Sequence, residues 1–144
     1  MDSRTISHRY QFELAAENSD VRNVECLLIT IIGDEARERT QLDCILRGEG
    51  DWRVRLTGRH EFSGAVLGTG REFALRASRE GIPDARGSKP RYELLDADAR
   101  VALFPADSSD DAWIEENLAT GDRAALAATV VAVLVGRELA GGRL

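Results

Sequence analysis

Arginine side chains at alternate positions are the strongest candidates for binding chemistry in this chain. Arg53 and Arg55 alternate with apolar residues, and Arg59 continues the same period of two. Because successive side chains of a β-strand point to opposite faces, these three guanidinium groups would share one face. Guanidinium groups bind phosphate and carboxylate with two parallel hydrogen bonds. We therefore predict a ligand-binding site at Arg53, Arg55 and Arg59, although a strand face that is only solvated shows the same alternation.

Groups suited to catalysis are scarce. The histidines are His8 and His60, and the cysteines are Cys26 and Cys44. A nucleophile–base pair of Cys44 and His60 would need a hydrogen bond and a third group to orient the base, and no such motif flanks either residue. Each cysteine lies in an apolar stretch, as expected for a small buried residue of a reduced protein. We predict no catalytic residues and lean against an enzyme.

Two segments resemble ligand-binding loops only in part. When the acidic segment that starts at Asp107 is aligned with a calcium-binding EF-hand loop, Ala112 takes the position that requires Gly, and Leu118 the position that requires a bidentate Glu. The segment Gly68-Thr69-Gly70 precedes a strand-like segment, whereas a phosphate-binding loop continues with Lys-Ser/Thr and a helix. We predict neither a metal site nor a cofactor.

The charge balance argues against nucleic acid as a partner. The 144 residues include 19 basic and 25 acidic side chains, with a formal net charge of −6, whereas nucleic-acid-binding domains show a basic balance or a basic stripe. No apolar stretch is long enough for a transmembrane segment, and the first residues lack the apolar centre of a secretory signal. These features predict one cytoplasmic domain over residues 1–144, without a transmembrane segment or a nucleic-acid partner.

The most apolar segment lies near the C-terminus. Residues 124–136 (AALAATVVAVLVG) contain no charged side chain. Its alanines favour a helix, Thr120 or Asp122 can supply the N-cap, and Gly141 suits the position after the last turn. A helix without a polar face must be buried all round, and this segment is too short to cross a bilayer. We predict a buried helix over residues 122–140.

Short strands account for most of the chain between residues 8 and 118. Alternating apolar patterns are separated by turns rich in Gly or Asp at residues 48–51, 68–70 and 96–99. The continuous apolar run at residues 24–32 indicates a strand that is covered on both faces. The pattern predicts a mostly β protein with one C-terminal helix (α+β), in which an antiparallel barrel or strongly curved sheet surrounds the helix. The expected strands are residues 8–16, 24–32, 40–47, 52–57, 72–77, 92–95, 100–104 and 112–118.

The C-terminal third of the chain carries a family resemblance. Residues 91–104 (RYELLDADARVALF), 112–118 (AWIEENL) and 121–139 (GDRAALAATVVAVLVGREL) are expected to form a strand, a turn, two further strands and a hydrophobic helix. This order resembles the tubby C-terminal-like barrel of tubby, phospholipid scramblase and LURP-one-related proteins, except that Ala99 stands where the family favours Gly. The resemblance implies a barrel around the helix and a non-enzymatic module that binds anionic membrane lipid or a protein partner. It assigns the family's lipid-binding basic side chains to no particular positions here.

Two other functions are compatible with these elements. In a helix-grip protein, a C-terminal helix closes a curved sheet over a cavity for a hydrophobic ligand or substrate. Such a helix usually has a polar outer face, which residues 124–136 lack, but an internal cavity of several hundred Å³ would favour this alternative. A regulatory or immunity-type protein would instead bind a single protein partner.

Overall fold

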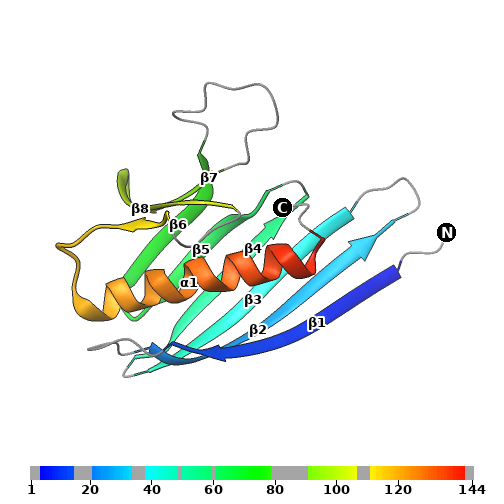
Figure 1. Ribbon diagram of the computed structural model, residues 1–144, viewed down its shortest axis with the longest axis horizontal. Coiled ribbons are helices and arrows are strands. Elements are labelled where there is room, and N and C mark those ends of the chain that lie inside the picture. The colour runs from blue at the N-terminus through cyan, green and yellow to red at the C-terminus, as the bar shows by residue number, and fades with distance from the viewer. Residues whose placement is uncertain are drawn as a thin grey trace.

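The fold combines one antiparallel sheet with one helix (Figure 1). The computed structural model describes residues 4–14, 21–33, 38–48, 50–59, 61–78, 91–106 and 111–141. In this part of the chain, nine strands pair in the order in which they follow one another, and the helix comes last. The elements are β1 (Arg4–Glu13), β2 (Val21–Ile32), β3 (Glu38–Gly48), β4 (Trp52–Gly58), β5 (Ser63–Gly68), β6 (Arg71–Ser78), β7 (Arg91–Asp96), β8 (Ala99–Pro105), β9 (Trp113–Ile114) and α1 (Thr120–Leu139).

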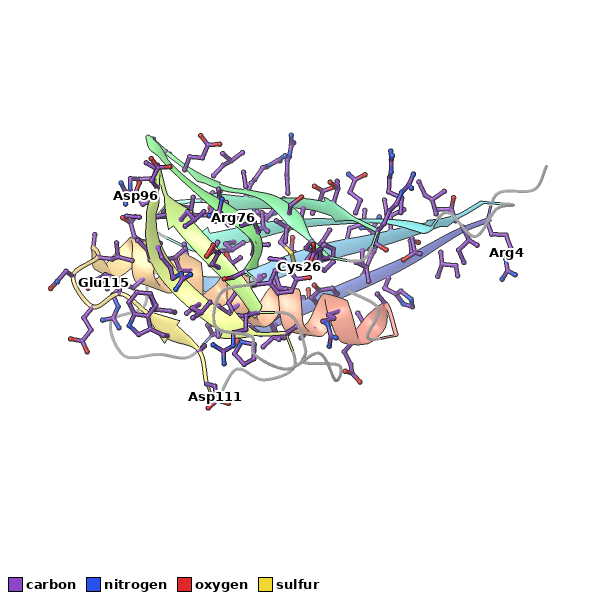
Figure 2. The ribbon with its side chains drawn as sticks, turned by 90° about the horizontal axis from the view of Figure 1, so that it is seen from above. Arg4, Cys26, Arg76, Asp96, Asp111 and Glu115 are labelled. Carbon is purple, nitrogen blue, oxygen red and sulfur yellow. A yellow bond between two sulfur atoms is a disulfide. The ribbon has the colours of Figure 1, made fainter. Side chains whose placement is uncertain are left out.

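The sheet curves around the helix without closing. Helix α1 packs against β2 and β3 towards one edge of the sheet and against β9 at the other edge. Figure 2 shows the sheet arching over one side of the helix. We call the face towards α1 the inner face and the opposite one the outer face. The mostly β fold with one C-terminal helix is confirmed, but the barrel is not, because the strand order leaves β1 and β9 as separate edges.

Strand alternation places the core on the inner face. In β4, for example, Trp52, Val54 and Leu56 are buried, whereas Arg53 and Arg55 are exposed. Inner-face side chains from β2 to β8 join the buried residues of α1 in a single hydrophobic core. The inner face is therefore occupied by packing, and the outer face presents the polar members of each strand.

The helix is not fully buried on every side. Its small residues, among them Ala125, Ala132 and Gly136, are buried against the sheet. Val131 and Leu134 are only half-buried, because the curved sheet covers only part of the circumference of the helix. The prediction that this helix is buried all round is therefore wrong, whereas its position in the chain is confirmed.

The predicted N-cap of the helix is wrong, whereas the glycine predicted after its last turn is confirmed. Ala119 is the N-cap and makes no side-chain capping bond, so the N-cap prediction for Thr120 or Asp122 is wrong. Asp122 lies in the first turn and receives a hydrogen bond of 3.1 Å from Nε of Arg71 instead. Gly141 follows the helix with a φ of 79°, a left-handed conformation that glycine adopts without strain, as predicted.

Three strand predictions need correction. Strand β5 was not predicted, because its sequence SGAVLG contains only two large apolar side chains. The strand expected at residues 112–118 is reduced to Trp113–Ile114. Strand β2 is not covered on both faces, since Leu27 and Ile29 are half-buried and Ile31 is 40% exposed on its outer face.

Candidate functional site

The predicted arginines lie on or beside the outer face of β4. Arg53 and Arg55 are two residues apart in this strand and both are exposed, because their neighbours Val54 and Leu56 occupy the core. Strand β4 ends at Gly58, so Arg59 lies in the connection to β5. The structure therefore brings Arg53 and Arg55 together and separates Arg59 from them.

A groove of about 600 Å³ crosses the outer face from β1 to β4. Its charged side chains are Arg9 from β1, Glu25 from β2, Asp43 from β3, and Arg53 and Arg55 from β4. Its uncharged outer-face lining consists of Gln11, Leu27 and Ile45. The groove therefore combines three guanidinium groups with two carboxylates and an aliphatic floor.

Among the residues that the structure describes, the carboxylates of the groove have partners and its guanidinium groups have none. Asp43 accepts a hydrogen bond of 2.9 Å from the side-chain amide of Gln41. Glu25 forms an ion pair of 3.4 Å with Arg47. Within the described residues, the side chains of Arg9, Arg53 and Arg55 form no hydrogen bond or ion pair. These three groups are therefore the ones that can bind an anion from solution.

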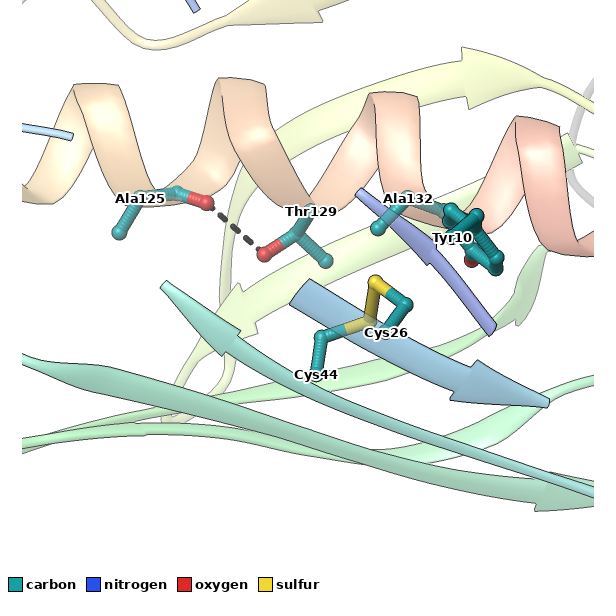
Figure 3. The surroundings of a disulfide bond; sticks show 6 residues. All are labelled: Tyr10, Cys26, Cys44, Ala125, Thr129 and Ala132. Atoms are coloured by element: carbon teal, nitrogen blue, oxygen red, sulfur yellow. Dashed lines mark hydrogen bonds between the residues drawn. A yellow bond between two sulfur atoms is a disulfide. The ribbon is translucent and has the colours of Figure 1, made fainter. Parts of the chain in front are cut away.

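Tyr10 attaches the β1 side of the groove to the helix. This residue stands between Arg9 and Gln11 in the chain, and its side chain points to the inner face (Figure 3). Its hydroxyl group donates a hydrogen bond of 2.6 Å to the backbone carbonyl of Ala132. Burial raises the pKa of Tyr10, so the hydroxyl group stays protonated and remains a donor at neutral pH. The contact holds an edge strand that pairs with only one neighbour.

A disulfide bond joins the two strands beneath the centre of the groove. Cys26 of β2 and Cys44 of β3 are directly opposite each other in the register, with their Cα atoms 4.1 Å apart. Figure 3 shows the bridge on the inner face, below α1. The expectation of two reduced cysteines is wrong, because both residues alternate onto the same face and the register makes them neighbours. The bridge links the strands that carry Glu25 and Asp43.

A second charged cluster lies on β6, β7 and β8. Glu93 is buried, with a side chain only 5% exposed, and it pairs with Arg76 at 3.1 Å and with Arg100 at 3.1 Å. Burial alone would raise the pKa of this carboxyl, but hydrogen bonds and attraction from Arg76 and Arg100 outweigh it and lower the pKa. This carboxylate holds three strands together through ion pairs, which explains its burial without a ligand.

Other predicted features are placed as follows. His60, the base of the hypothetical pair with Cys44, lies outside the described residues, and so do Asp107 and residues 108–110 of the acidic segment. Cys44 itself is in the disulfide. The described part of the chain contains no cluster of ligands suited to a metal ion. Trp52 is a core residue and stacks on Phe73 at 5.8 Å. Trp113 is 44% exposed.

The prediction from sequence missed Arg9. Alternation in residues 8–16 already placed Arg9 and Gln11 on the polar side of their strand. The missing information was the strand order, which sets β1 three positions from β4 and so extends the arginine face across the sheet.

Comparison with known proteins does not place the chain in a family. No family model, no curated protein and no solved structure matches it. No helix in the described part of the chain combines the length and the apolar character required to cross a membrane.

Proposed function

We propose that this protein is a non-enzymatic binding module that holds the headgroup of an anionic lipid at Arg53 and Arg55. The observation that carries the proposal is that these exposed guanidinium groups lie in a groove and form no ion pair or hydrogen bond in the described part of the chain. Two neighbouring guanidinium groups can bind the oxygens of one phosphate or carboxylate through charge-assisted hydrogen bonds, which are stronger than hydrogen bonds between neutral groups.

The surroundings of Arg53 favour an amphiphilic ligand over a simple inorganic anion. Arg53 is directly opposite Ile45 of β3 on one side and Leu67 of β5 on the other. Ile45 is half-buried in the groove, and Leu67 is 36% exposed beside it. A headgroup bound to the guanidinium group would therefore have aliphatic surface on both sides for its apolar part.

The position of the groove distinguishes this proposal from the helix-grip alternative. That alternative places a ligand between the sheet and the helix. Here the inner-face side chains and α1 pack into one core, and the groove described above lies on the other face of the sheet. A membrane-lipid role of the tubby or LURP-one type remains part of our proposal, supported by the order β7, turn, β8, β9 and α1 at the end of the chain.

Vesicle flotation tests the proposal. We expect the protein to float with vesicles that contain an anionic phospholipid, and to remain unbound with vesicles of zwitterionic lipid alone. Raising the ionic strength should release it, because exposed charges are screened over about 10 Å at 0.1 M salt. Absence of binding to any vesicle, together with capture of one stoichiometric protein partner through the same groove, would contradict the lipid role.

A further inference from the structure

The arginines of the groove stand at its two ends. Arg9 of β1 is directly opposite Leu27 of β2, which is directly opposite Asp43 of β3. Asp43 is in turn directly opposite Arg55 of β4. Three steps between neighbouring strands, each about 4.8 Å, separate the backbone of Arg9 from that of Arg55 by about 14 Å. One ligand group bound at Arg55 therefore leaves Arg9 available for another.

The middle of the groove disfavours negative charge. Glu25 and Asp43 lie on β2 and β3, between the strands that carry the arginines, and an anionic group placed over these two middle strands would meet like charge. Leu27 and Ile45 alternate with these carboxylates and offer an aliphatic floor. A molecule that fills the groove therefore suits it best when its charges are at its ends and its centre is neutral and apolar.

We infer that the ligand of this groove carries two anionic groups, one bound at Arg53 and Arg55 and the other at Arg9, joined by an apolar segment. This inference rests on the proposed function, since it takes the Arg53–Arg55 end as the primary anion site. It adds Arg9 as the residue that selects a two-headed lipid over a lipid with one anionic group. The side-chain amide of Gln11 lies at the same end and can donate to the second anionic group.

Isothermal titration with soluble probes tests this inference. The probes are linear α,ω-dicarboxylates of increasing chain length, from succinate to hexadecanedioate, each compared with the monocarboxylate of equal length below its micellar concentration. We expect the dicarboxylate to bind at least about tenfold more tightly at an intermediate length, because a second charge-assisted contact forms only when the chain spans the groove. Equal affinity of the two series at every length would overturn the inference.

Two variants separate the inference from the proposed function. Arg9→Gln should remove the advantage of the dicarboxylates over the monocarboxylates of equal length. Arg39→Gln is the matched control, since Arg39 is exposed on β3 outside the groove, and it should alter neither series. An advantage of the dicarboxylates that persists in Arg9→Gln would also overturn the inference. Absence of binding by both series in the unmodified protein would overturn the proposed function with it.

The same probes show whether the bound molecule is a membrane component. A two-headed anion presented in zwitterionic vesicles should recruit the protein, and the free dicarboxylate of best length should displace it. Recruitment that the free dicarboxylate does not reduce would place vesicle binding elsewhere on the surface and contradict the inference.

Discussion

The hydroxyl oxygen of Tyr10 lies 2.6 Å from the backbone carbonyl oxygen of Ala132, so the first strand of the sheet is tied directly to the C-terminal helix. Tyr10→Phe removes this hydrogen bond and keeps the aromatic ring in place. We expect the free energy of unfolding to fall by about 1 kcal/mol, the usual net contribution of one such bond. Urea denaturation followed by circular dichroism measures the difference. An unchanged midpoint would show that the contact contributes nothing to the attachment of β1.

The incomplete burial of α1 leads to a prediction about two valines. Val133 is fully buried, whereas Val131 is half-buried on the same helix. Val133→Asp should prevent folding, because it places an unpaired charge in the core. Val131→Asp should give a folded protein, since its carboxylate can reach water. Thermal unfolding of both variants checks this, and equal loss of folding would mean that the helix is enclosed on all sides.

The disulfide between β2 and β3 should contribute measurably to stability. Cys26 and Cys44 are 18 residues apart, and a bridge that closes a loop of this length stabilises a domain by about 3 kcal/mol. We expect the double variant Cys26→Ala/Cys44→Ala to lose about that free energy of unfolding. Addition of a reductant should destabilise the unmodified protein by a similar amount and leave the variant unaffected. A reductant effect on both proteins would contradict this assignment.

Local sequence patterns predicted most of the strands, because an alternating pattern or a turn depends only on residues that are neighbours in sequence. The alternation around Arg53 and the turns at residues 68–70 and 96–99 are of this kind, and so is Gly141 after the helix. Arg59 shows the limit of such patterns. Its spacing would place it on the same face as Arg53, but β4 ends at Gly58, and side chains alternate between two faces only within a strand.

Features that depend on strand order and sheet curvature were not predictable from one sequence. Arg9 joins Arg53 only because β1, β2, β3 and β4 pair in chain order. The Cys26–Cys44 bridge depends on the register of β2 with β3. The apolar composition of α1 correctly indicated a core helix, but the partial exposure of Val131 follows from how far the sheet curves.

The buried carboxylate of Glu93 should make stability depend on pH. Its pKa in the folded protein is lowered by Arg76 and Arg100, against the opposing effect of burial. The unfolded chain, where a Glu has a pKa of about 4.3, therefore takes up a proton first as the pH falls. The stabilisation by ionised Glu93 is fully present above that value and is lost as the pH falls through the lower folded pKa.

Replacement of Glu93 tests this dependence. At pH 7, Glu93→Gln should reduce the free energy of unfolding by roughly 1–3 kcal/mol, and the difference from the unmodified protein should shrink at pH 3. Glu72→Gln, at an exposed position of β6, serves as the control and should change stability little at either pH. A difference for Glu93→Gln that is the same at both pH values would contradict the ionic role.

The central claim is that the unpaired guanidinium groups of β4 bind an anionic lipid, and flotation of defined variants with anionic vesicles tests it most directly. The double variant Arg53→Gln/Arg55→Gln should bind at least about tenfold more weakly than the unmodified protein, with an unchanged melting temperature. The double variant Arg39→Gln/Arg59→Gln, which also removes two positive charges but outside the groove, should bind as the unmodified protein does. Equal binding by all of these proteins, or an equal loss in every variant, would contradict the assignment of lipid binding to this groove.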